Sequence, residues 1–407
     1  MTTHPLPAPK TSPLIDQNIS AITIYDGNQV HIPDRLLPTN PDIGNAAKQR
    51  AWGLEQVARA GQFQGTPLEQ LCEVAGRACY DSFGRGRNSA DYHQHIETVG
   101  HGSVWEHANF TIDIDRDYAH FSTLVNRPGV FVIPGHKHLG REHRVRVTVN
   151  LRAVAEWYNI QPLYPSDTYP YGCIEALRFF AGGLAPQIKA AGVIQSIADT
   201  TALMQRSGAM LVEPEHDEEK WVSMLLTGSR GMSHEQVRHG DRTAISQRST
   251  RFVDEDGNPW VEHPLISLFL AEEALGNSVS ASIEVETLRT TSGICTNAAR
   301  TAYATTVQCL EPWLIARGVD KQTARKQARG AARGYLGNAL YTEVVFSASV
   351  AQWKRMLKQR CSRFADAEIR CVYNPVLMEL KRGRYADCFN DFSLVPSPDD
   401  IGQILAE

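Results

Sequence analysis

The chain has 407 residues, 42% of them hydrophobic, so it can bury one large core or two smaller ones. Its eight cysteines include no CxxC pair, which indicates reduced thiols and not a disulfide framework or a zinc site. Its formal net charge of -4 argues against a protein dedicated to binding nucleic acids. No apolar run approaches the roughly 20 residues that span a bilayer, and the N-terminus lacks a signal-peptide core, so we expect a cytoplasmic protein without a membrane partner.

The N-terminal part is rich in proline before a helical pattern begins. We interpret residues 1–45 as an extended arm with one short strand at 22–25. Residues 47–80 have the apolar spacing of a helix. The glycine-broken basic segment at 82–88 is weak evidence for phosphate binding, and we favour a plain turn.

A polar cluster followed by a strand occupies residues 100–115. Apolar and polar residues alternate from 110 to 114, which predicts a strand with one buried face. Two histidines and a glutamate in the cluster suit a metal ion, but the spacing lacks the i, i+4 histidine pair of a helical zinc site. A second histidine group lies at 136–143, and for both groups we favour solvated loops and predict no metal. The clustered side chains are His101, Ser103, Glu106 and His107.

Alternating valines predict another strand at residues 145–149. It leads into Asn150, which we expect to cap a helix running through Trp157. A further helix is predicted from residue 174 to about residue 191.

Residues 229–254 hold five arginines, two histidines and several hydroxyl side chains. The apolar residues from 221 to 226 recur at roughly helical intervals, so we predict a helix that leads into this cluster. Ser249 and Arg251 are two positions apart, and on an extended backbone both point to one face. A hydroxyl beside a guanidinium binds phosphate well; a solvated charged loop is the alternative.

The C-terminal part is predicted to be mainly helical. Arg325, Arg329 and Arg333 share one helix face; such a stripe is usually solvated but can present one arginine to a phosphate. The polar residues from about 393 are expected to be loosely held. The predicted elements are a turn at 256–259, helices at 266–290, 302–315 and 321–336, a strand at 340–346, and helices at 349–360 and from 365.

Several separated segments resemble, in their order, the flavin-dependent thymidylate synthases. That family has a GHxSxxEHxxFTF stretch, an SR pair leading through RHR to SxRY, an AR pair followed by a threonine, and an arginine before an AQxEIR-like segment. The shared order, over about residues 76–115 and 222–380, makes the resemblance specific. The matching residues are His101, Ser103, Glu106, His107, Phe110, Thr111, Ser229, Arg230, Arg238, His239, Ser249, Arg251, Ala332, Arg333, Thr342, Arg360 and residues 365–370.

The chain also departs from the family pattern. Gly240 replaces the third arginine of RHR, and residues 349–351 replace an NxR motif. About a hundred residues separate the EH stretch from the SR pair, where the family has a short link. Within them, residues 116–127 look like a worn copy of residues 230–239. The segment ending at Asn150 and Arg152 likewise looks like the one ending at 349–351.

These likenesses suggest a fused pair of repeats. The hypothesis divides the chain into an arm at 1–45, a first repeat at 46–192, a second at 193–392 and a tail at 393–407. The alternative is one domain with an unrelated insertion. The resemblance implies an α+β fold, the thymidylate-synthase-complementing-protein fold, with a mixed sheet packed against helices in two pseudo-symmetric repeats.

The resemblance also implies a reaction and a site. The reaction is reductive methylation of dUMP at C5 to give dTMP, with methylenetetrahydrofolate as carbon donor, FAD as cofactor and NADPH as reductant. Arg360 would stabilise charge on the base, Ser249, Arg251 and Arg333 would hold the phosphate, and Gln247 would orient the sugar or base. Family sites lie between subunits, so we expect a homo-oligomer, either a dimer of fused repeats or a tetramer. The residues expected to border the flavin are His101, Ser103, Glu106, Arg238, His239, Asn150 and Arg152.

Three other functions remain open. A related enzyme would methylate UMP or another pyrimidine nucleotide, or install a hydroxymethyl group at C5. A decayed relative would bind nucleotide without catalysis. Nucleic-acid binding through the arginine stripe at 325–333 is the weakest of them, because the chain is acidic.

Overall fold

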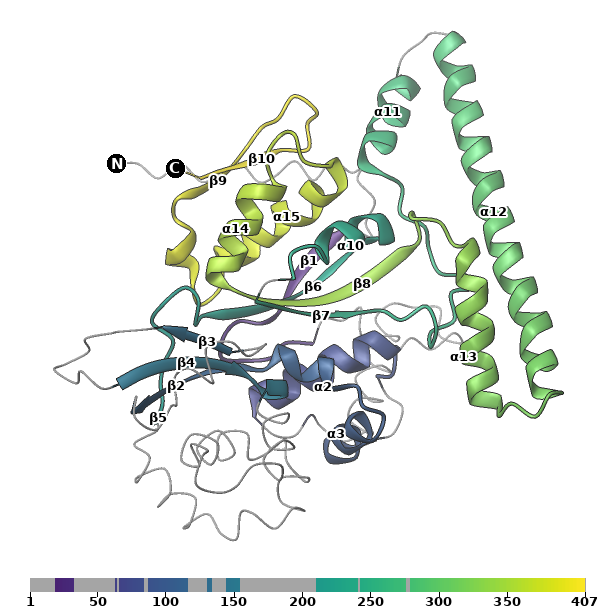
Figure 1. Cartoon of the computed structure of the whole chain (residues 1–407). Helices are drawn as coiled ribbons and strands as arrows, with labels where there is room; N and C mark the ends of the chain where they lie inside the picture. Colours follow the sequence, from purple (N-terminus) through teal and green to yellow (C-terminus); the bar gives the residue numbers. More distant parts are fainter. Residues whose placement is uncertain are drawn as a thin grey trace.

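The computed structural model describes residues 19–32, 63, 66–83, 87–115, 130–133, 144–153, 210–240, 242–275 and 279–406. Within them the chain combines helices with antiparallel strands, which confirms the α+β class (Figure 1). Most of the arm, most of the helix expected at 47–80 before residue 66, the helix expected at 174–191, the histidine group at 136–143 and the worn copy at 116–127 lie outside the described residues.

Sheet A is an antiparallel sheet with the strand order β1-β6-β8-β7. All nine residues of each central strand, β6 and β8, are buried because helices cover both faces of the sheet. The predicted strands at 22–25 and 340–346 are confirmed as β1 and β8. The strands are β1 (Ser20–Tyr25), β6 (Trp221–Ser229), β7 (Thr243–Gln247) and β8 (Tyr341–Ser349).

The helix predicted over residues 221–226 is wrong, because this segment is strand β6. A strand that is buried on both faces needs apolar side chains at successive positions and loses the two-residue alternation. A short run of that kind cannot be distinguished from a buried helix by periodicity.

Sheet B is also antiparallel and has the order β5-β2-β4-β3. The strands predicted at 110–114 and 145–149 are confirmed as β2 and β4. Only the first turn of the helix expected after Asn150 is described, at residues 151–153. The strands are β2 (Asn109–Asp115), β3 (Val130–Ile133), β4 (Arg144–Asn150) and β5 (Met210–Leu211).

The two sheets match strand by strand, with β5, β2, β4 and β3 in the places of β1, β6, β8 and β7. Residues 109 and 130 pair with neighbouring residues of β4 and are 21 positions apart in the sequence. Residues 221 and 243, which pair with neighbouring residues of β8, are 22 positions apart. The two-repeat division stays a prediction, which this register supports. The equivalent pairs are Asn109 with Asn150, Val130 with Val149, Trp221 with Ser349, and Thr243 with Ala348.

The sheets differ in the connection between their outer and central strands. Residues 134–143 connect β3 to β4, whereas residues 248–340 connect β7 to β8 and contain a helical insertion. The helix predicted at 266–290 is divided between α11 and α12, and α12 stands beside α13 away from the sheets (Figure 1). The insertion consists of α11 (Pro264–Leu275), α12 (Val279–Ile315), α13 (Lys321–Ala332) and the short helix η5 (Arg333–Tyr335).

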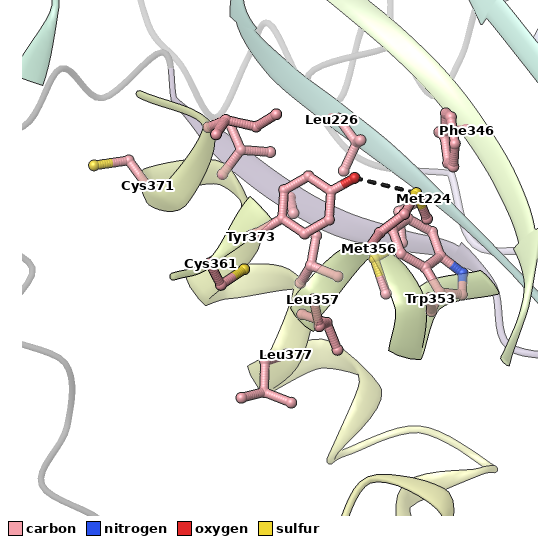
Figure 2. Close-up of a cluster of buried hydrophobic side chains, with 14 of the residues drawn as sticks. Met224, Leu226, Phe346, Trp353, Met356, Leu357, Cys361, Cys371, Tyr373 and Leu377 are labelled. Atoms are coloured by element: carbon pink, nitrogen blue, oxygen red, sulfur yellow. Dashed lines mark hydrogen bonds between the residues drawn. The ribbon is translucent and has the colours of Figure 1, made fainter. Parts of the chain in front are cut away.

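Different helices cover the two faces of sheet A. Helices α14 (Val350–Arg360) and α15 (Ala367–Leu380), both predicted, pack on one face, where Met224 and Phe346 meet Trp353 in the main core (Figure 2). Helix α10 (Arg230–Gln236) also packs on this face, through Met232. Helix α2 (Pro67–Tyr80) covers the other face, together with α3 (Ser89–Thr98) and η2 (Gly102–His107), which pack against α2.

Two buried side chains connect the segments around the two sheets reciprocally. His107, two residues before β2, lies between the hydroxyls of Ser347 and Ser246 in sheet A, at 2.7 and 3.0 Å. Burial lowers the pKa of His107 to about 3, so its ring is neutral. Glu219, two residues before β6, accepts from Arg146 of sheet B at 2.7 Å. Each sheet therefore receives a polar side chain from the segment that precedes a central strand of the other.

The tail is held firmly, so the prediction of a loose end from residue 393 is wrong. The segment forms η6 (Ala386–Phe389), β9 (Phe392–Val395) and β10 (Gln403–Ala406), and the two strands pair with each other. Arg370 of α15 is buried and binds both carboxylate oxygens of Asp399 and the backbone oxygen of Gly402. No described helix is long and apolar enough to cross a membrane.

Replacing Asp399 with Asn should destabilise the protein by about 2 kcal/mol at pH 7, less than for a fully buried pair because the carboxylate is 31% exposed. Hydrogen bonding to Arg370 holds the pKa of Asp399 well below its usual value of 3.8. The stabilisation is therefore present at neutral pH and is lost as the pH falls below about 4. Thermal unfolding followed by circular dichroism should show that Asp399→Asn is less stable than the wild type, with a smaller difference in stability at pH 3.5 than at pH 7. The neighbouring Asp400→Asn is the control, and an Asp399→Asn deficit that does not change with pH contradicts the prediction.

Candidate active site

A cavity of about 1210 Å³ lies between the segment of α2 and α3 and the segment that follows β7. The C-terminal end of α2, helix α3 and His101 line it on one side. The residues directly after β7, helix α13 and Arg333 line it on the other. The cavity is therefore shared by segments more than a hundred residues apart in the sequence.

The cavity wall is strongly basic although the whole chain is acidic. Nine arginine and lysine side chains line it against two aspartates, a net charge of +7 before histidines are counted. Such a concentration of one charge attracts anionic ligands. The lining residues are Arg77, Arg87, Arg230, Arg248, Arg251, Arg325, Lys326, Arg329 and Arg333 on the positive side and Asp81 and Asp254 on the negative side.

Some of these cations are already occupied by the fold. Arg77 donates to Glu73 and to two backbone oxygens, which holds the segment after α2. Arg329 pairs with Asp254 at 2.6 Å. These contacts give Arg77 and Arg329 a structural role in shaping the wall.

Four arginines of the wall have no carboxylate partner among the described residues. No described carboxylate lies within 4.0 Å of Arg87, Arg230, Arg251 or Arg333. Burial lowers the pKa of Arg230, and the charge of Arg333 lowers it further. Bringing an anion between these guanidinium groups would relieve this repulsion, so the cavity suits phosphate or carboxylate.

Four of the residues expected to bind substrate line this cavity together: Gln247, Ser249, Arg251 and Arg333. The backbone N–H of Ser249 donates to the oxygen of Cys79 at 2.9 Å, which fastens this segment to α2. Phe252 and Val253 donate back to the oxygen of Ser249, so residues 249–253 form a turn. The extended backbone predicted for Ser249 and Arg251 is therefore wrong, although both side chains reach the cavity.

Gln247 is oriented by two hydroxyl groups. Its side-chain nitrogen donates to Ser233 at 2.8 Å and to Thr342 at 3.2 Å. With both N–H groups engaged, the carbonyl oxygen of the amide is the atom available to accept a hydrogen bond from a ligand.

Aromatic side chains border the basic part of the cavity. The hydroxyl of Tyr80 lies 2.9 Å from Nδ1 of His101, and its ring meets Phe252 edge-on at 4.9 Å between centroids. Burial raises the pKa of Tyr80 to about 12 and lowers that of His101, so both side chains are neutral near pH 7. No sequence motif marks Tyr80, and only the packing of α2 brings it to this wall.

Four residues expected to border the flavin lie next to the cavity but do not line it. Glu106 pairs with Arg152. Asn150 is buried and accepts from the N–H of Ala153 at 2.9 Å, which confirms the predicted helix cap. Ser103 belongs to the same short helix as Glu106. Of the expected cofactor residues, only His101 reaches the cavity wall.

Arg360, Arg238 and His239 lie away from the cavity. Arg360 donates to Nε2 of His239 at 2.7 Å and to Glu235 at 2.9 Å. Its helix, α14, covers the face of sheet A opposite to α2, so the sheet keeps Arg360 from the cavity. Within this chain Arg360 does not reach the cavity that Arg251 and Arg333 line, and its part in the site stays a prediction.

Arg230 and Arg248 line the cavity but were not selected as site residues. Arg230 begins α10 directly after the end of β6, and Ser229 caps that helix by accepting from the N–H of Met232 at 3.0 Å. The SR pair was the sequence signal for Arg230. Nothing in the sequence pattern distinguished Arg248. Among the described residues, no three histidine, cysteine, aspartate or glutamate side chains group as metal ligands.

Replacing Arg251 or Arg333 with Ala should weaken binding of a nucleoside monophosphate about tenfold or more, because each removes an unpaired charge from the anion site. Calorimetric titration of the full chain measures the effect, and higher salt should weaken the wild-type complex. Arg317→Ala, at an exposed arginine that stacks on Trp313, is the matched control. Equal affinities for all four proteins would show that the anion binds elsewhere.

Comparison with known proteins finds a family that part of the chain resembles. Residues 220–383 match the family model described as thymidylate synthase complementing protein. This segment contains Gln247, Ser249, Arg251, Arg333 and Arg360.

Individual proteins also resemble a part of the chain. The flavin-dependent thymidylate synthase of Mycobacterium sp. (strain KMS) is 34% identical over 182 residues, which is 44% of this chain and 65% of that protein. The enzyme of the same description from Mycobacterium tuberculosis (strain ATCC 25177 / H37Ra) is 33% identical over 182 residues, 44% of this chain and 64% of that protein. The chain thus spans just under two thirds of the curated relatives it matches.

A solved structure, that of a UMP/dUMP methylase PolB from Streptomyces cacaoi bound with 5-Br UMP, aligns over 50% of this chain and 86% of that chain, with 14% identity and a TM-score of 0.29. That TM-score is too low to establish a shared fold. The similarity to a known family rests instead on residues 220–383, which match the model of the thymidylate synthase complementing proteins, and on relatives that are 34% identical over 44% of this chain.

Proposed function

We propose that the protein is a flavin-dependent enzyme that methylates dUMP at C5, with methylenetetrahydrofolate as carbon donor and NADPH as reductant. The observation that carries this proposal is the meeting of Gln247, Ser249, Arg251 and Arg333, all from the family segment, in one basic cavity. The printed names of the relatives support the choice of reaction.

The phosphate of the nucleotide would bind to Arg251 and Arg333. A phosphate dianion accepts charge-assisted hydrogen bonds from guanidinium groups, and a hydroxyl such as that of Ser249 adds a neutral donor. Arg230 lies close enough to Arg333 for the two charges to repel. This repulsion destabilises the part of the cavity around Arg230, Arg251 and Arg333 when no anion is bound. It therefore favours ligands that carry two negative charges.

Gln247 would recognise the base. Its carbonyl oxygen can accept from N3–H of a uracil ring, while the hydroxyls of Ser233 and Thr342 fix the amide in that orientation. A cytosine ring has no hydrogen on N3, so the same contact would select uracil.

Carbon–carbon bond formation at C5 of uracil is slow because this carbon is a poor nucleophile. One chemical solution is attack on C6 by a cysteine thiolate. Cys79 is the cysteine that lines the cavity among the described residues, and burial raises its pKa to about 12. A thiol that stays protonated at neutral pH does not suit that role, which favours a route without a cysteine nucleophile.

A flavin would bind beside the nucleotide, and the size and lining of the cavity support this. Its volume of about 1210 Å³ exceeds the roughly 300–1,000 Å³ of common ligand sites. Tyr80, Phe252 and His101 offer aromatic surface, and the unpaired arginines offer contacts for phosphate. A bound reduced flavin would supply the hydride, while these residues hold and orient the rings and exclude water.

We further propose that the active form is a homo-oligomer and that a second copy supplies Arg360. The anion end of the cavity holds Arg251 and Arg333, whereas Arg360 faces away on the other side of sheet A. A symmetric pair of chains could bring each Arg360 to the cavity of its partner.

The decisive assay follows tritium release from C5-labelled dUMP with FAD, methylenetetrahydrofolate and NADPH. Product mass distinguishes a methyl from a hydroxymethyl group, and parallel assays with labelled UMP test the rival substrate. The flavin absorbance with and without dUMP reports cofactor binding. A protein that binds dUMP but neither binds flavin nor releases tritium would be a nucleotide-binding protein without catalysis, which overturns the proposal.

Cys79→Ala should keep most of the wild-type kcat, because loss of a true nucleophile costs several orders of magnitude whereas loss of a packing thiol does not. Steady-state kinetics with dUMP measure the kcat of the variant. Its unfolding temperature shows whether the substitution has disturbed the packing around residue 79. A collapse of kcat with unchanged stability would reinstate the cysteine mechanism.

Mixing Arg251→Ala with Arg360→Ala should restore activity that neither variant has alone, provided the two residues come from different chains. Random pairing into symmetric dimers regenerates about one quarter of the wild-type sites. The control is a mixture of Arg251→Ala with Arg333→Ala, which share one cavity wall and should not complement. If both mixtures stay inactive, Arg360 does not act across an interface.

A further inference from the structure

Glu255 is a buried carboxylate directly behind the basic wall of the cavity. Its side chain is 1% exposed, and one of its oxygens, Oε2, accepts from Nδ2 of Asn258 at 2.5 Å. Its backbone N–H donates to the hydroxyl of Tyr303 in α12 at 3.2 Å. The helical insertion thus holds this residue in place.

The other oxygen of Glu255 faces the cavity arginines without a hydrogen bond. Oε1 lies 3.7 Å from Nε of Arg248, too far for a hydrogen bond, and both atoms are buried without a partner. Arg230 also interacts electrostatically with this carboxylate. A buried polar group without a hydrogen bond destabilises the folded state by on the order of 1–3 kcal/mol. The arrangement of Glu255 and Arg248 is therefore not optimised for stability alone.

Arg248 is held between two carboxylates and the cavity. Its other contact is with Asp81, whose carboxylate lies 3.7 Å from Nη1. The guanidinium of Arg248 therefore lines the cavity while both of its carboxylate neighbours lie too far away for a hydrogen bond, at 3.7 Å. A phosphate in the cavity would give it a third, closer partner.

From this geometry we propose that Glu255 is a positioning residue, a buried counter-ion that aims Arg248 and Arg230 at the phosphate of the nucleotide. The inference rests on the proposed function, because it takes the anion to be that phosphate. Glu255 touches no ligand itself. It fixes the positive groups in the empty cavity and reduces their mutual repulsion.

The groups around Glu255 also predict a pH dependence. Burial raises the pKa of Glu255, and the charges of Arg248 and Arg230 oppose that rise. As the pH falls through this pKa, the carboxyl becomes neutral and no longer holds the arginines. The advantage of wild type over Glu255→Gln should therefore shrink at lower pH. The facing groups are Arg248 and Arg230 on the positive side, Asp254 on the negative side, and the neutral Asn258 and Tyr303.

The test compares dUMP with deoxyuridine, which lacks the phosphate, by calorimetric titration of the full chain. Glu255→Gln should weaken dUMP binding about tenfold and leave deoxyuridine binding unchanged. Asp256→Asn, an exposed carboxylate in the same loop, should change neither affinity. In turnover assays the loss should fall mainly on KM for dUMP.

Each other outcome decides against the inference. Equal weakening of both ligands would make Glu255 a structural residue, and an unchanged or tighter dUMP complex would remove its positioning role. If Glu255→Gln does not fold, Arg248→Gln must show the same phosphate-dependent loss, and its absence overturns the inference. Failure of the wild-type protein to bind dUMP would instead refute the proposed function, and the inference with it.

Discussion

The buried ring of His107 is the contact on which the arrangement of the site depends. A neutral imidazole between the hydroxyls of Ser347 and Ser246 joins η2 to sheet A. The backbone hydrogen bond from Ser249 to Cys79 adds a second connection beside the cavity. Because these contacts hold α2 and η2 against sheet A and the segment after β7, His101 and Tyr80 face the same cavity as Arg251.

The charge distribution separates structure from function. Arg370, Arg77 and Arg146 are buried, and each is matched by a carboxylate. Arg251 and Arg333 have no such partner among the described residues, although they share one cavity. Charges without a partner of opposite sign destabilise the folded protein, and they are found at sites where a bound ligand supplies the opposite charge.

The two sheets show how a symmetric plan can hold an asymmetric site. Their strand order and register correspond, and His107 and Glu219 make reciprocal contacts from equivalent positions. Sheet A carries a helical insertion between its outer and central strands, and that insertion supplies α13, Arg333 and the support for Glu255. The connection at the same position of sheet B is ten residues long, 134–143. The insertion and the helices that precede sheet B therefore contribute different walls to one cavity.

The sequence by itself determined the elements with clear periodicity, such as β2, β4, α14 and α15, and it singled out Ser249, Arg251 and Arg333, which line one cavity, because motif spacing and side-chain chemistry are local properties. Tertiary structure decided the rest. Strand β6 was mistaken for a helix because burial on both faces removes the alternation that marks a strand. Arg360 was grouped with Arg251 because a motif does not reveal on which face of a sheet a helix packs. The tail was expected to be loose because its anchor, Arg370, lies 29 residues before Asp399, and only folding brings that pair together.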